Sequence, residues 1–141
     1  VDVTVDEETG EYDINKLVLA IDCGLAIDPG QAEGQVEGAE HMALEYATRE
    51  LLTFDEDGKP EVTGFRQYGM PRASEQPPME TILVEPHEPS GPFGAKSIGE
   101  VPTNPLPPAL ANAIRNAVGV RITSLPITAE KIKAELDATD S

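Results

Sequence analysis

Hydrophobic and polar positions alternate in two stretches at the start of the chain. Residues 1–5 alternate strictly, which is typical of a strand with one buried face. Residues 14–22 are more continuously apolar, which predicts a second and more central strand. Because residues 8–11 (Glu-Thr-Gly-Glu) are typical of a turn, we expect the two strands to form a β-hairpin.

A helical pattern follows over residues 31–52. Its apolar positions are Val36, Ala39, Ala43, Tyr46 and Ala47. Gly30, Gly34 and Gly38 recur at four-residue intervals near its start, although each glycine costs a helix about 1 kcal/mol relative to alanine. The stripe indicates that a neighbouring backbone or a bound cofactor packs very close to this face, and an ordinary close contact between helix and sheet explains it equally well.

The second half of the chain carries further elements. The pattern predicts a turn at 53–60, an extended segment near 68–72, a strand at 80–85, a helix at 108–118, a short strand at 120–123 and a last helix capped by Thr128. Residues 1–141 are therefore expected to form a single α+β domain. We expect a mixed or antiparallel sheet of roughly four or five strands, with two or three helices packed on it.

The charge balance narrows the possible partners. The chain holds 26 Asp and Glu against 10 Lys and Arg, for a net charge of −16, which disfavours nucleic acid as a partner. It has no apolar run long enough for a membrane span. The charge favours a halophilic source, with an ordinary acidic bacterial protein as the alternative. The lone Cys23 is expected to be a buried, inert thiol, and we expect a cytoplasmic protein.

The loop at residues 91–102 (GPFGAKSIGEVP) holds the best candidate for chemistry, Glu100. A carboxylate in a tight, partly apolar loop is desolvated, and desolvation raises its pKa toward the range that suits a general base. Lys96 would act in the opposite direction. The alternative is a surface glutamate in a proline-rich loop. His41 and His87 lack metal-ligand spacing, so no metal site is expected in the chain itself.

Three motifs resemble the molybdenum hydroxylases, a family that includes xanthine dehydrogenase, aldehyde oxidase and the large subunit of aerobic carbon monoxide dehydrogenase. They are residues 33–38 (Glu-Gly-Gln-Val-Glu-Gly), 68–72 (Tyr-Gly-Met-Pro-Arg) and 94–100 (Gly-Ala-Lys-Ser-Ile-Gly-Glu). The resemblance covers essentially the whole chain. It implies the C-terminal portion of a molybdopterin-binding region, either as a fragment of a larger molybdenum subunit or as a small subunit of a split version. The first residue, Val1, fits a piece of a longer protein.

The resemblance also implies roles for particular residues. Glu100 would be the base in a reaction that inserts a water-derived oxygen into a C–H bond. Gln35 and the backbone at Ile98 and Gly99 would bind the molybdenum–molybdopterin cofactor. The expected partners are the remainder of the molybdenum subunit and iron–sulfur and FAD proteins, and the chain alone is expected to be inactive.

Two departures from the family pattern leave an alternative open. Ala43-Leu44-Glu45 stands where the family often has Gly-hydrophobic-Gly, and Ser97 replaces the usual Gly or Ala. The alternative is a non-catalytic structural module of the same fold that binds a protein partner. If the catalytic interpretation holds, Glu100 should lie close to Gln35.

Overall fold

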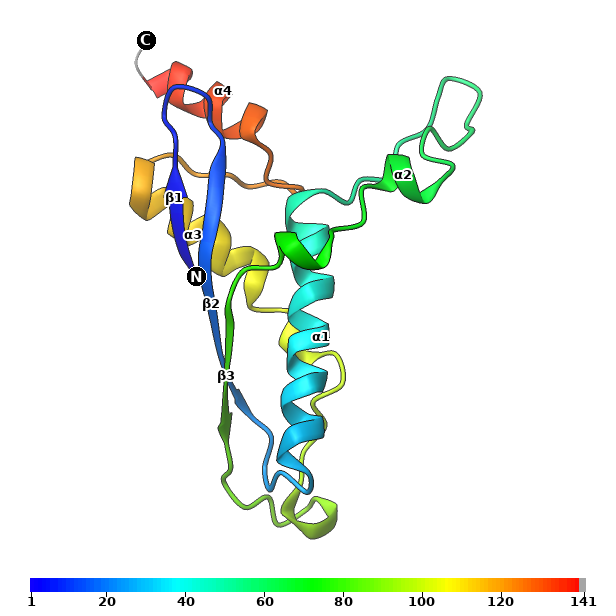
Figure 1. Ribbon diagram of the computed structural model, residues 1–141, viewed down its shortest axis with the longest axis vertical. Helices are drawn as coiled ribbons and strands as arrows, with labels where there is room; N and C mark the ends of the chain where they lie inside the picture. The colour runs from blue at the N-terminus through cyan, green and yellow to red at the C-terminus, as the bar shows by residue number, and fades with distance from the viewer. Residues whose placement is uncertain (140–141) are drawn as a thin grey trace.

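A computed structural model describes residues 1–139 and contains a three-stranded mixed sheet (Figure 1). Strand β1 (Asp2–Val5) pairs antiparallel with β2 (Tyr12–Asp22), and β3 (Met79–Val84) pairs parallel with the other side of β2. This confirms the α+β class, the hairpin and the mixed sheet. The expected strand at 120–123 is absent from the described residues, so the sheet is smaller than predicted.

Three longer helices accompany the sheet. Helix α1 (Pro29–Thr48) begins after Asp28, whose carboxylate accepts a hydrogen bond from the Gln31 N–H at 3.1 Å. Helix α3 (Leu106–Val118) ends at Gly119, which adopts φ 83°, and α4 (Ala129–Thr139) closes the described chain. Helix α1 was predicted to reach residue 52, but it ends at Thr48, one turn earlier.

Short elements occupy the connections. The segment expected to be extended near 68–72 begins with a four-residue helix, α2 (Phe65–Tyr68). Single 3₁₀ turns follow at Ala73–Glu75 (η1), Pro92–Gly94 (η2) and Val101–Thr103 (η3). Figure 1 shows that the chain from the end of α1 to α2 projects away from the rest of the molecule, whereas the η3 segment runs back along α1.

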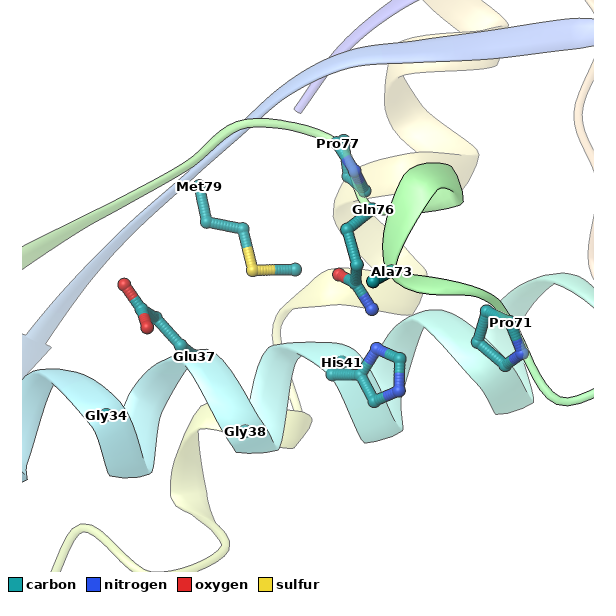
Figure 2. Close-up of a pocket in the computed structure, with 9 residues that line it drawn as sticks. All are labelled: Gly34, Glu37, Gly38, His41, Pro71, Ala73, Gln76, Pro77 and Met79. Carbon is teal, nitrogen blue, oxygen red and sulfur yellow. The ribbon is translucent and has the colours of Figure 1, made fainter.

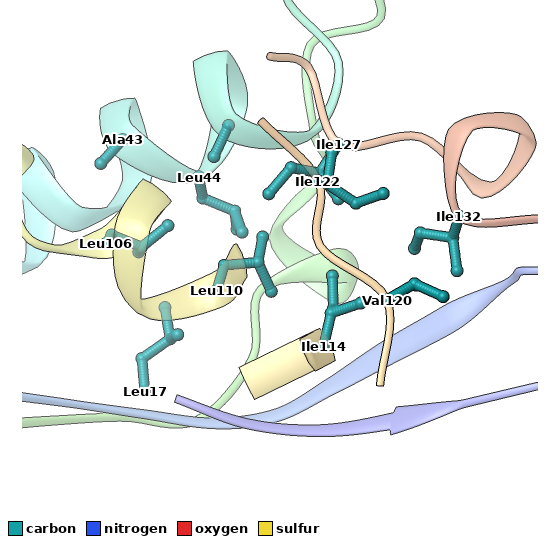
Figure 3. Packing of buried hydrophobic residues seen from close by; sticks show 11 residues of the cluster. Leu17, Ala43, Leu44, Leu106, Leu110, Ile114, Val120, Ile122, Ile127 and Ile132 are labelled. Atoms are coloured by element: carbon teal, nitrogen blue, oxygen red, sulfur yellow. The ribbon is translucent and has the colours of Figure 1, made fainter. Parts of the chain in front are cut away.

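The hydrophobic core lies where α1, α3 and the C-terminal segment meet the sheet (Figure 3). Its largest fully buried side chains include Leu17, Leu110, Ile114, Ile127 and Ile132. Val120 and Ile122 are also buried there, so their alternation reflects an extended segment packed on the core. Two further bonds fix this segment: the Tyr12 hydroxyl donates to the Ile127 carbonyl at 2.7 Å, and the Ile127 N–H donates to the Ala47 carbonyl at 2.7 Å.

Candidate functional site

The loop that follows β3 is bonded to the end of β2. The Leu25 N–H donates to the Gly94 carbonyl, and the Lys96 N–H donates to the Cys23 carbonyl, both at 2.8 Å. The Lys96 ammonium donates to the Asp22 carboxylate at 2.6 Å. This hydrogen bond lowers the pKa of Asp22 and raises the pKa of Lys96. The loop is therefore held by both its main chain and a charged side chain.

Glycine is required at two points of this attachment. Gly24 adopts φ 60°, and a Cβ there would lie 2.3 Å from the Gly94 carbonyl oxygen. Gly94 adopts φ 81°, and a Cβ there would lie 2.4 Å from the His87 ring. Both values are far inside van der Waals contact. A larger residue at Gly24 would push the loop away from β2, and one at Gly94 would displace the His87 ring within the loop.

Helix α1 holds the main chain on both sides of Glu100. The Gln35 side-chain amide donates to the Gly99 carbonyl at 2.8 Å, and the Tyr46 hydroxyl donates to the Thr103 carbonyl at 2.7 Å. The Glu100 carbonyl accepts from the N–H and hydroxyl of Thr103, at 3.0 and 2.7 Å. The structure therefore brings Gln35, Gly99 and Glu100 together, as expected for a shared site.

Two expectations about the surroundings of Glu100 are wrong for this part of the protein. The Glu100 side chain is exposed, and a Cβ on the adjacent Gly99 would meet no described atom within 4 Å. The loop alone therefore does not desolvate the carboxylate. Lys96 bonds to Asp22, so its charge is engaged at the end of β2.

The glycine stripe of α1 faces open space. A Cβ at Gly34 or Gly38 would meet no described atom within 4 Å. Both glycines line an open groove of about 600 Å³ between α1 and the residues that lead into β3 (Figure 2). The predicted close neighbour is therefore not supplied by residues 1–139.

Sequence reasoning missed two carboxylates. Asp22, the partner of Lys96, is the last residue of β2 and carried no local signal. Glu40 is only 3% exposed, and its Oε2 atom makes no hydrogen bond to a described residue. Burial raises the pKa of Glu40, and the Glu37 carboxylate adds to the rise. Its spacing from Val36 and Leu44 places it on the apolar face of α1, which was a readable signal.

Three further features concern the Cys23 thiol, possible metal-binding groups and possible membrane-spanning helices. Cys23 is buried, as predicted, and burial raises the pKa of its thiol. Residues 1–139 contain no group of three or more His, Cys, Asp or Glu side chains arranged to hold a metal ion. None of the helices formed by these residues is both long and apolar enough to cross a bilayer.

The residues beside Glu100 fit one side of a polar cofactor. Gly99 leaves its surroundings open, Ile98 is half-buried, and the exposed Gln35 amide lies against the same backbone. These groups offer backbone and amide hydrogen-bonding atoms next to a carboxylate. Two of the three motifs, residues 33–38 and 94–100, thus lie side by side.

Comparisons with known proteins identify the family of the chain. The molybdopterin cofactor-binding domain family matches residues 1–77. The chain is 36% identical to the "Probable hypoxanthine oxidase XdhD" of Escherichia coli over 137 residues, which is 96% of this chain and 14% of that protein. It is 35% identical to a xanthine dehydrogenase molybdenum-binding subunit of the same species, covering 96% of this chain and 18% of the subunit.

Solved structures give the same result. The CO dehydrogenase of Oligotropha carboxidovorans superposes with a TM-score of 0.87 at 28% identity, over 98% of this chain and 18% of that one. The aldehyde oxidoreductase of Desulfovibrio gigas superposes with a TM-score of 0.84 at 31% identity, over 96% and 15%. The chain thus spans less than one fifth of these relatives. It belongs to the molybdopterin cofactor-binding domain family and corresponds to part of the large subunit of the molybdenum hydroxylases.

Proposed function

We propose that this chain forms one side of the active site of a molybdenum hydroxylase, with Glu100 as its general base. The observation that carries the proposal is the hydrogen bond from the Gln35 amide to the Gly99 carbonyl, which joins residues 64 apart in sequence directly beside Glu100. Gln35 and the backbone at Ile98 and Gly99 contact the molybdopterin. When bound, the cofactor supplies the redox chemistry of substrate oxidation.

The proposed role of Glu100 follows from the different environments of its main chain and its carboxylate. Its main chain is fixed through Thr103 and, on α1, through Gln35 and Tyr46. Its carboxylate stays exposed, so it can accept a proton from a water-derived oxygen held in front of the loop. General-base catalysis of this kind contributes about 10²- to 10⁴-fold to a rate.

The rest of the enzyme must complete this site. The chain spans only 14–18% of the relatives compared above, and a Cβ on Gly99 would meet no described atom within 4 Å. The remainder of the molybdenum subunit therefore encloses Glu100, and iron–sulfur and FAD proteins receive the electrons. We place the reaction in the cytoplasm, where a lone thiol such as Cys23 stays reduced.

The alternative of a non-catalytic module loses its main support. That support was the departure from the family pattern at residues 43–45. Ala43 is buried in the hydrophobic core, and Glu45 pairs with His41 at 3.3 Å. These residues serve the packing of α1, so their identity carries no argument against catalysis at Glu100.

The test is Glu100→Gln in the complete enzyme, purified from its own source and assayed with a dye acceptor. We expect the rate to fall about 10²- to 10⁴-fold while the molybdenum content stays unchanged, because the exposed side chain adds little to folding. Glu135→Gln, an exposed position on α4, is the matched control and should keep the full rate.

Two other outcomes are informative. A near-normal rate for Glu100→Gln would show that another group is the base. A purified complex without molybdenum would favour the structural module.

A further inference from the structure

Strand β3 leaves one edge of the sheet unpaired among the described residues. The strand order is β1-β2-β3. The Pro78 carbonyl accepts from the Leu17 N–H of β2 at 2.9 Å, and the Val84 carbonyl accepts from the Cys23 N–H just after β2 at 3.1 Å. Because the main-chain groups of alternate strand residues point to opposite sides, those of Met79, Thr81 and Leu83 point away from β2. Such an edge is a template for a further strand.

The groove described above lies between this edge and α1. Gly34, Glu37, Gly38 and His41 form its wall on α1, and Gln76, Pro77 and Met79 line the opposite side. Figure 2 shows the Met79 side chain pointing into the space above Glu37 and His41. A strand added to β3 would lie about 4.8 Å beyond it, and its inward side chains would enter this groove.

The glycines of α1 keep the groove open. Alanine at Gly34 or Gly38 would meet no described atom within 4 Å and would favour the helix. Their presence is therefore explained by something outside this chain that needs the space. The unpaired edge of β3 beside this groove is an independent observation, and a segment that paired with this edge would also fill the groove.

We propose that an extended segment from the remainder of the molybdenum subunit adds to the free edge of β3 and packs apolar side chains over Gly34 and Gly38. The relatives carry more than four fifths of their length outside the part matched here, which supplies the polypeptide. A second copy is disfavoured, because each copy carries a net charge of −16. The identity of this partner rests on the proposed function.

The first test is residue-resolved hydrogen exchange on the complete enzyme. The amides of Thr81 and Leu83 should exchange as slowly as those of Ile82 and Val84, which face β2 and serve as internal controls. If Thr81 and Leu83 exchange at least 100-fold faster than these controls, the edge is open and the proposal is wrong.

The second test separates the possible occupants. A photo-crosslinking residue at Gly38 should join this chain to a peptide from the rest of the molybdenum subunit, whereas the same residue at the exposed Glu33 should give at least tenfold less of this product. Crosslinks to a second copy or to an unrelated protein would overturn the proposal. Labelling of molybdopterin without any polypeptide product would also overturn it and would assign the groove to the cofactor.

A substitution that fills the groove tests the same point in the complete enzyme. Gly38→Leu should speed the exchange of the Thr81 and Leu83 amides at least tenfold, because its side chain would displace the added strand. Glu33→Leu, at an exposed position, is the matched control and should leave this exchange unchanged. Unchanged exchange in Gly38→Leu would contradict the proposal. Molybdenum content and the Glu100→Gln rate report separately on the proposed function, so the two can fail independently.

Discussion

Each half of α1 buries one face (Ala32 and Val36 in the first half), but the two halves serve different parts of the molecule. In the C-terminal half, Ala43, Leu44 and Ala47 are buried against α3 and the segment that carries Ile127. In the N-terminal half, Gly34, Gln35 and Gly38 are exposed, and the neighbouring loop is attached by hydrogen bonds. Helix α1 thus joins a hydrophobic core formed by residues of this chain to a site that the rest of the enzyme must complete.

This difference teaches how the fold divides its tasks. The core end obtains its stability from residues of this chain alone. The site end, which is the N-terminal half of α1, fixes the Gly99 carbonyl through Gln35 and leaves nearby side chains open to whatever completes the enzyme. Tyr46 fixes the Thr103 carbonyl from the core end. Substitutions should therefore affect stability at the core end and association or activity at the site end.

The largest effect on stability is expected in the core. Ile114 is fully buried among Leu110, Val120 and Ile132. Ile114→Ala should lower the free energy of unfolding by about 2–5 kcal/mol, because it removes apolar contacts and leaves a cavity. Urea denaturation followed by circular dichroism measures the loss. A loss below about 1 kcal/mol would mean that the core end is as loosely packed as the site end.

The next largest effect concerns the junction between the two halves. Glu40 is buried beside Leu17, Pro102 and Leu106, and its Oε2 atom has no partner among the described residues. Glu40→Met should raise the free energy of unfolding at pH 7 by about 1–3 kcal/mol, since it removes a buried unsatisfied group. The gain should shrink in acid, because the raised pKa of Glu40 lets the folded state take up a proton first.

A smaller effect is expected where the hairpin meets the C-terminal segment. Burial raises the pKa of Tyr12 to about 12, and its hydroxyl donates to Ile127. Tyr12→Phe should cost about 0.5–1.5 kcal/mol at pH 8 by loss of this bond. The folded state favours the protonated phenol, so this contribution is lost as pH rises from 10 towards 12. Since a rise of two pKa units corresponds to about 2.7 kcal/mol, the difference between wild type and Tyr12→Phe should shrink to zero and then change sign in alkali. The hydrogen bond to Glu50 also raises the pKa of Tyr68 to about 12. Because Tyr68 is present in both proteins, its titration does not contribute to this difference.

The smallest effect has the opposite sign and lies at the site end. Gly34→Ala should raise the free energy of unfolding by up to about 1 kcal/mol, because alanine favours the helix and its Cβ meets no described atom. Thermal unfolding of wild type and variant measures the gain. Destabilisation would mean that the glycine face already has a close neighbour within this chain.

Much of the fold could be predicted from periodicity. The hairpin, β3 and the longer helices follow from alternation or helical spacing, since each buries a face that the sequence displays. The predicted extension of α1 to residue 52 was wrong because Leu51 and Leu52 continue the apolar pattern, yet both are exposed. Residues 120–123 alternate correctly, but no local pattern tells whether a second strand is there to pair with them.

The candidate site was predicted less completely. The closeness of Gln35 to Glu100 came from the resemblance of whole motifs, because spacing alone says nothing about contacts over such a distance in sequence. The exposure of Glu100 was missed because desolvation depends on what covers the loop, which the loop sequence does not contain. Lys96 was expected to act on Glu100 because the two are close in sequence, whereas its partner is Asp22 at the end of β2.

The parallel pairing of β2 with β3 has a consequence for the order of folding. Strand β1 meets β2 through a short turn, and hairpins of this kind form in about 1–10 μs. Strand β3 reaches β2 only after α1 and the whole projecting segment have been passed, so its loop-closure entropy is larger. We expect the hairpin to form first and β3 to dock late. Because Gly94 and Lys96 bond to the end of β2 just beyond β3, the loop that carries Glu100 would be among the last parts to take its final position.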